Sequence, residues 1–196
     1  QALSMTTMNV NIINTALVGS LLSPLPWLAT LGLSLQFAAS MLTTLPASLL
    51  MVRFGRKPIF MVGVLIAVLA TFAQGIAILF TNFTLFCMAS MCLGIAQGCA
   101  SFYRYAAADS AEDTQKPRAI SYVLAGGLLA AFMGPEIARN AVELVPGHLY
   151  AGCYFIVSLV QLVSLVILSG IDIPKPQRTA AGGRPITVFF KMPIFV

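Results

Sequence analysis

The residues of this sequence best suited to chemistry are amides and hydroxyls that recur at the spacing of one helix face. Residues three and four apart in a helix lie on the same side. Three such sets occur: Thr7, Asn11 and Asn14; Gln36, Ser40 and Thr43; and Gln97, Ser101 and Arg104. Such groups bind a solute by hydrogen bonds and do not suit acid–base catalysis. The pattern predicts the wall of a solute-binding cavity, and hydrogen bonds between helices are the alternative.

These side chains lie in segments that are too apolar for a water-soluble domain. Hydrophobic residues make up 59% of the 196 residues, charged residues make up 9%, and the mean hydropathy is +0.92. A soluble domain carries about 25% charged residues. Six apolar runs are long enough to span a bilayer: about 1–22, 27–52, 58–80, 82–103, 119–142 and 149–170. Strand alternation is absent, so we expect an all-α membrane protein, a six-transmembrane-helix bundle.

The polar sets are unevenly shared among the runs. They fall in 1–22, 27–52 and 82–103, while Tyr122 lies near the start of 119–142. Polar groups in a membrane turn away from lipid. We therefore expect these four helices to line a path and the other two, nearly featureless apart from Gln74 and Gln161, to face lipid.

Positive charge is concentrated in alternate loops. Ten of the 11 Lys and Arg residues lie in the turn at 53–57, in 104–118 or after residue 170. Only Arg139 lies on the other side, a bias of ten to one. Basic loops remain in the cytoplasm, so we expect both ends of the chain there, in a plasma or inner membrane. The net charge of +5 then reflects topology and anionic lipid, with no nucleic acid as a partner.

No pattern indicates an enzyme, a metal site or a cofactor. The four cysteines lie inside expected helices without metal-ligand spacing, and hydrolase and nucleotide-binding motifs are missing. We therefore predict a non-enzymatic protein that uses no cofactor. Two local ambiguities remain open. Arg104 could bind an anion, pair with Asp109 or anchor the helix end, and Glu136 could pair with Arg139 or couple transport to protons.

The basic turn "SLLMVRFGRK" resembles the signature loop of the major facilitator superfamily, G-x-x-x-D-R-x-G-R-R. Arg53, Gly55, Arg56 and Lys57 match, whereas Ser48 replaces the first glycine and Val52 replaces the aspartate. The resemblance implies an inner gate at this turn. Because Val52 cannot supply the acid, the candidate partners of the cations are Asp109, Glu112 and Asp113, and Asp109 is the expected one because it lies closest to the helix end.

Two further stretches resemble motifs of the same family. "AGGLLAAFMGPEIA" matches the glycine-rich motif of the fifth helix at Gly126, Gly127, Gly134 and Pro135, and Glu136 follows directly. "GIAQGCASFYR" matches the fourth-helix motif R-x-x-Q-G at Gln97 and Gly98, but Gly94 stands where that motif has its arginine.

The resemblance implies the amino-terminal six-helix half of a secondary transporter. Such a protein would move a small organic solute across the lipid bilayer by alternating access, coupled to a proton or cation. It would need a carboxy-terminal six-helix half, and 171–196 would be a cytoplasmic connector leading into a further apolar segment. A six-helix channel, a half-size protein working as a dimer and a membrane scaffold are the alternatives.

Overall fold

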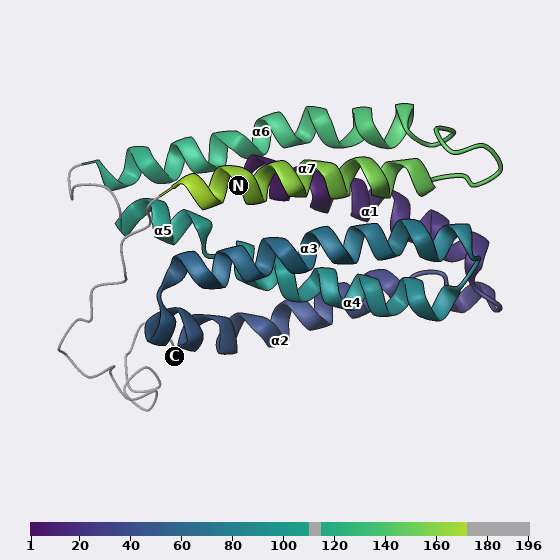
Figure 1. Ribbon diagram of the computed structural model, residues 1–196, viewed down its shortest axis with the longest axis horizontal. Helices are drawn as coiled ribbons and strands as arrows, with labels where there is room; N and C mark the ends of the chain where they lie inside the picture. The colour runs from purple at the N-terminus through teal and green to yellow at the C-terminus, as the bar shows by residue number, and fades with distance from the viewer. Residues whose placement is uncertain (110–114, 172–196) are drawn as a thin grey trace, which may run out of the picture.

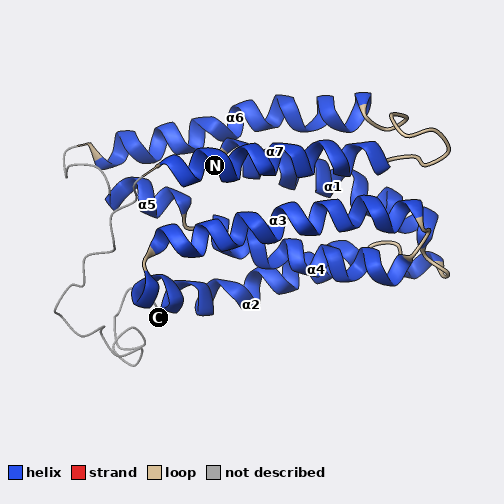
Figure 2. Cartoon of the chain, viewed as in Figure 1, coloured by secondary structure: helices blue, strands red, loops and turns tan. Residues whose placement is uncertain are grey.

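The computed structural model describes residues 1–109 and 115–171, and within them every regular element is a helix (Figures 1 and 2). The long helices are α1 (Ala2–Leu22), α2 (Leu31–Phe54), α3 (Arg56–Leu79), α4 (Phe83–Ala100), α6 (Lys116–Asn140) and α7 (Ala151–Gly170). Two short ones are η1 (Pro26–Leu28) and α5 (Tyr103–Asp109). The predicted all-α fold is confirmed. The expected run 82–103 is divided, because α4 ends at Ala100 and α5 begins at Tyr103.

Five segments of the described residues are long and apolar enough to cross a membrane. They are Pro26–Phe54, Arg56–Leu79, Phe83–Ala107, Ile120–Asn140 and Ala151–Gly170. Helix α1 is as long, with 21 residues, but Asn9, Asn11 and Asn14 lower its hydropathy. Six membrane crossings, and the proposed connector at 171–196, which lies outside the described residues, therefore stay predictions.

The long helices run along one axis and place their connections at two opposite ends (Figure 1). One end carries the turn between α2 and α3, helix α5, the start of α6 and the end of α7. The other end carries the α1–α2, α3–α4 and α6–α7 connections. Helix α4 packs between α2 and α3, α3 also packs on α7, and α1 packs chiefly on α6. Loops that are basic in the sequence thus share one end of the bundle.

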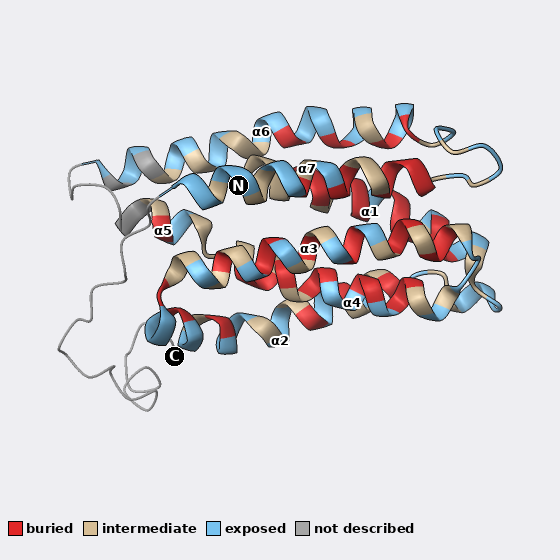
Figure 3. Ribbon diagram, in the orientation of Figure 1, coloured by how far each residue is buried: buried red, intermediate tan, exposed pale blue. Residues whose placement is uncertain are grey.

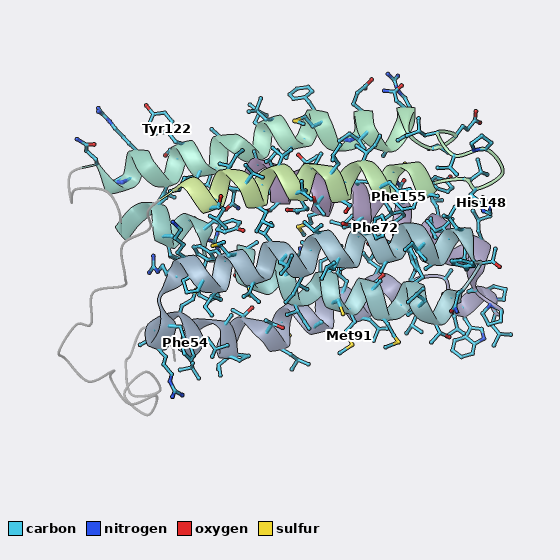
Figure 4. The ribbon with its side chains drawn as sticks, viewed as in Figure 1. Phe54, Phe72, Met91, Tyr122, His148 and Phe155 are labelled. Carbon is cyan, nitrogen blue, oxygen red and sulfur yellow. The ribbon has the colours of Figure 1, made fainter. Side chains whose placement is uncertain are left out.

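Burial differs from the expected division between path-lining and lipid-facing helices. Helices α3 and α7 are about as well enclosed as α1 and α4, whereas α2 and above all α6 present mostly exposed residues (Figure 3). The physical reason is close packing, since α3 and α7 contact each other through Gly75 and Phe155 and through the ring pair Phe72–Phe155, 5.5 Å apart between centroids (Figure 4). The large apolar side chains left exposed, such as Met41 and Leu42, suit a surface in contact with lipid.

Helices α2 and α4 approach each other through two glycines one turn apart. A Cβ atom built on Gly94 would lie 2.1 Å from the carbonyl oxygen of Gln36, and one built on Gly98 would lie 2.9 Å from that of Ser40. No side chain fits at Gly94 in this packing. Gly94, which stands where the family motif has an arginine, is therefore the residue that allows the two backbones to approach this closely.

We expect Gly94→Ala to destabilise the protein, because the new methyl group must push α2 away from α4. Overpacking of this kind costs about 1–3 kcal/mol, and the melting temperature of the purified full-length protein in detergent should fall by several degrees. Gly170→Ala is the matched control, since a Cβ there meets no atom within 4 Å. Equal melting temperatures for the two variants would contradict the close approach.

Candidate functional site

A cavity of about 270 Å³ opens between the helices and is lined by side chains from α1 to α5, with one residue each from α6 and α7. Of the predicted residues, six lie on its wall: Thr7, Gln36, Ser40, Gln97, Ser101 and Arg104. Asn11, Asn14, Thr43 and Tyr122 do not. The cavity thus brings together predicted polar residues from α1, α2, α4 and the start of α5.

Two amides meet across the α2–α4 contact. Gln36 Nε2 donates a hydrogen bond to Gln97 Oε1 over 3.1 Å, and Gln97 Nε2 contacts the sulfur of Met8 at 2.8 Å. The Gln36 side chain is only 1% exposed, yet its Oε1 accepts no hydrogen bond from the described residues. The cavity wall therefore contains a fixed amide with an unused acceptor.

The rest of the wall is neutral except for one cation. The described wall residues include no Asp, Glu, His or Cys, and their only charged side chain is that of Arg104. Arg104 is exposed, and its Cζ lies 5.1 Å from the centroid of the Tyr105 ring. The neighbouring Tyr103 packs edge-on against Phe60, with centroids 4.7 Å apart. This composition suits a neutral or anionic solute better than a cation.

Asn11 and Asn14 are buried inside the bundle. Asn11 Oδ1 accepts hydrogen bonds from Gln74 Nε2 at 3.1 Å and from Thr15 Oγ1 at 3.0 Å. Gln74 also donates to Ser90 Oγ at 2.9 Å. These contacts join α1, α3 and α4. Asn11 therefore forms hydrogen bonds between helices and does not line the cavity. The missed residue is Gln74, and the signal for it was a single amide in an otherwise apolar helix.

Gln161 borders the cavity and links α7 to α1 by a hydrogen bond. Its Nε2 donates to Thr7 Oγ1 over 2.7 Å, and both residues border the cavity. Gln161 lies on α7, which the sequence predicts to face lipid. Its amide, like that of Gln74, was visible in the sequence as a lone polar group, but a single group defines no helix face.

The basic turn is tight because Gly55 adopts a conformation that other residues rarely take. Its φ of 92° lies in the left-handed region, and it ends α2 and begins α3. Arg53 is exposed, with its Cζ 5.3 Å from the centroid of the Phe54 ring, while Arg56 and Lys57 are half-buried. Asp109 ends α5, but its side chain lies outside the described part of the structure. The inner gate formed by these residues stays a prediction.

The glycine-rich motif of α6 packs against α1. Cβ atoms built on the three glycines would meet, at 3.2, 2.9 and 2.6 Å, one residue each of α1. The pairs are Gly126 with Ala2, Gly127 with Met5, and Gly134 with Asn9. Asn9 Nδ2 also donates to the carbonyl oxygen of Ala130 at 3.1 Å. The motif therefore forms a helix-packing surface, next to Pro135 within the same helix.

Glu136 and Tyr122 lie on the outer surface of α6. Glu136 forms an exposed ion pair with Arg139 at 2.8 Å and accepts a hydrogen bond from Asn140 at 2.6 Å. Tyr122 is 78% exposed and points away from the bundle (Figure 4). Neither borders the cavity. Of the two roles considered for Glu136, the structure contains the ion pair with Arg139. Its position on the outer surface gives no support to a role in proton coupling.

A metal centre is not evident in the described residues, where no three His, Cys, Asp or Glu side chains gather. All four cysteines have free thiols, and Cys92 is the exposed one.

Comparison with known proteins agrees with this geometry. The family model described as Major Facilitator Superfamily matches residues 2–196. The chain is also 33% identical over 200 residues to the riboflavin transporter RfnT of Brucella anthropi, in an alignment that covers 100% of this chain and 50% of that protein. The chain thus spans about half the length of this relative. No solved structure gave a significant match.

The chain belongs to the major facilitator superfamily, a class of helical membrane transporters. The predicted family membership is confirmed, and the half-length match is consistent with an amino-terminal half of such a protein. These findings place the helical bundle in a family of membrane transporters.

We expect the cavity to admit water-soluble reagents. In a cysteine-free background of the full-length protein, Ser101→Cys should react with a hydrophilic maleimide at least about tenfold faster than Ser158→Cys. Ser101 is exposed on the cavity wall, whereas Ser158 is buried and donates to the carbonyl oxygen of Val68. Labelling rates in detergent, measured by mass shift, provide the test. Similar rates at the two positions would mean that the cavity is closed to water.

Proposed function

We propose that this chain is the amino-terminal half of a secondary active transporter that moves a small organic solute by alternating access. The observation that carries the proposal is a cavity with amides and hydroxyls on an otherwise apolar wall, within a membrane helix bundle of this family. A cavity wall with Gln36 and Gln97 side by side would form one side of a solute site near the middle of the bilayer. A carboxy-terminal six-helix half would supply the other side.

The substrate class follows from the relative and from the charge of the wall. RfnT is named as a riboflavin transporter, and riboflavin is a neutral molecule with many hydrogen-bonding groups. The described cavity wall offers amides, hydroxyls and one cation, Arg104, without a carboxylate. We therefore propose a flavin or a related neutral heterocycle as the transported solute.

Coupling to a proton or cation is part of the proposal. The described wall has no carboxylate, and Glu136 lies on the outer surface in an ion pair. A coupling carboxylate would therefore belong to a part of the protein outside the described cavity, such as the second half.

Membrane orientation is proposed from charge. The end of the bundle that carries the α2–α3 turn also carries α5 and the start of α6 (Figure 1). Basic residues are concentrated in these segments. The positive-inside rule places this end in the cytoplasm. Both ends of the chain would then be cytoplasmic, in a plasma or inner membrane.

We expect the full-length protein, reconstituted in proteoliposomes, to take up labelled riboflavin with saturable kinetics. A proton or cation gradient should drive accumulation above the outside concentration, and an ionophore should abolish it. Protein-free vesicles are the control. Uptake that rises in proportion to concentration and never exceeds equilibrium would favour the channel alternative. Absence of riboflavin uptake alongside uptake of another solute would overturn the flavin assignment.

The basic turn is proposed to act as an inner latch with the acidic end of α5. Helix α5 is anchored beside this turn, since Ala106 packs in one cluster with Met51 of α2 and Phe60 of α3. A single exposed ion pair contributes only about 0–1 kcal/mol. A partly shielded cluster could contribute more, and a shift of about 1.4 kcal/mol changes two populations tenfold.

We expect Arg56→Glu to lower the transport rate of the full-length protein about tenfold with a smaller effect on its membrane abundance, because the reversed charge repels Asp109. Adding Asp109→Arg should restore part of the rate. Uptake assays normalised to the amount of protein measure both effects. Arg56→Gln is the control without charge reversal. Normal transport by Arg56→Gln, together with no rescue in the double variant, would reduce the turn to a topology signal.

A further inference from the structure

We propose that Gln36 is the specificity-determining residue of the cavity and that it recognises a planar heterocycle carrying an N–H donor beside a carbonyl acceptor. Cyclic imides and lactams have this edge, and the imide of the flavin ring is one example. The inference rests on the proposed function, because it assigns to one side chain the recognition of the solute that the transporter would carry.

The first observation is the unused hydrogen-bonding capacity of Gln36. Its amide carries one acceptor oxygen and two N–H donors. Nε2 uses one donor on Gln97, and Oε1 has no partner among the described residues although the side chain is almost fully buried. Gln36 thus borders the cavity with an acceptor that has no partner among the described residues, as does Gln161 on the opposite helix α7.

The second observation is that neighbouring groups hold this amide in place. Gln97 Oε1 accepts the hydrogen bond from Gln36, and Gln97 in turn contacts Met8 through its own Nε2. Gly94 brings the two helices close enough for this pair. Gln97 thus positions Gln36, which is consistent with a recognition site, because a preorganised polar group discriminates better than a mobile one.

The third observation is the chemistry of the surrounding wall. Met5 and Met8 supply polarisable thioethers, which make favourable contacts with aromatic rings. The described wall contains no carboxylate that would attract a cation. A flat, neutral ring could lie against the thioethers while its N–H donates to Gln36 Oε1 and its carbonyl accepts from Gln36 Nε2.

This arrangement predicts a specific discrimination. A site that hydrogen-bonds a ligand N–H rejects an analogue that lacks it, because the buried acceptor is then left without a partner. N3-methylriboflavin lacks the imide N–H and adds a methyl group at the same place. We expect the wild-type full-length protein to bind it at least about tenfold more weakly than riboflavin.

The experiment is a titration of each flavin with purified full-length protein in detergent, followed by quenching of flavin fluorescence. It reports binding even when a variant does not transport. Gln36→Met has a similar length without the amide, and it should weaken riboflavin binding about tenfold while changing the N3-methyl analogue little. The ratio of the two dissociation constants should therefore approach one.

Two further variants separate recognition from structure. Gln97→Met removes the group that positions Gln36 and should lower the ratio partly, which keeps the test valid if Gln36→Met does not fold. Gln74→Met is the matched control, because Gln74 is also a buried amide but does not border the cavity. It should preserve the ratio whatever its effect on yield.

The outcomes distinguish this inference from the proposed function. Riboflavin binding with equal affinity for the N3-methyl analogue, or a ratio that Gln36→Met leaves unchanged, would overturn the role of Gln36 and leave the transporter proposal intact. Failure of the wild-type protein to bind either flavin would overturn the flavin assignment itself, and this inference with it.

Discussion

The close approach of α2 and α4 is the constraint on which the cavity depends. Gly94 and Gly98 leave room for the backbone carbonyls of Gln36 and Ser40, and the two helices then bring Gln36 and Gln97 within hydrogen-bond distance. Packing of this kind replaces the hydrophobic effect in a membrane, where lipid is as apolar as the side chains it surrounds. The same contact that holds the helices together therefore also presents polar groups to a solute.

A second polar system holds the other helices in register. Asn11, Gln74 and Ser90 link α1, α3 and α4 through hydrogen bonds in the interior, and Gln161 links α7 to α1 through Thr7. Buried polar groups without partners are costly in lipid, so these bonds favour one arrangement of helices over others. Helix α6 is joined to α1 separately, by the hydrogen bond from Asn9 Nδ2 to the carbonyl oxygen of Ala130 and by close contacts at its glycines.

The sequence predicted the helical fold and the family because apolar run length and motif spacing are local properties. Among the polar residues that the sequence singled out, Thr7, Gln36, Ser40, Gln97, Ser101 and Arg104 border the cavity, and their role in binding a solute stays a prediction. The sequence could not tell that Asn11 lies away from the cavity. Residue spacing shows which residues share a helix face, but it does not show which other helix packs against that face. Gln74 lies one helix away on α3, and only the packing of α1, α3 and α4 assigns the two amides to the interior.

The interior amides have a consequence for biosynthesis. The ribosome makes α1 before α3 and α7, yet Asn11 finds its partner on α3 and Thr7 finds its partner on α7. Thr7 and Asn11 also form hydrogen bonds within α1, to Leu3 and with Thr15, so α1 provides acceptors that are in place before the amides of α3 and α7 are made. The amide of Gln161 meets its acceptor, Thr7 Oγ1, only once α7 has packed against α1. The hydrogen bonds of this bundle are thus complete only after α7 has joined α1.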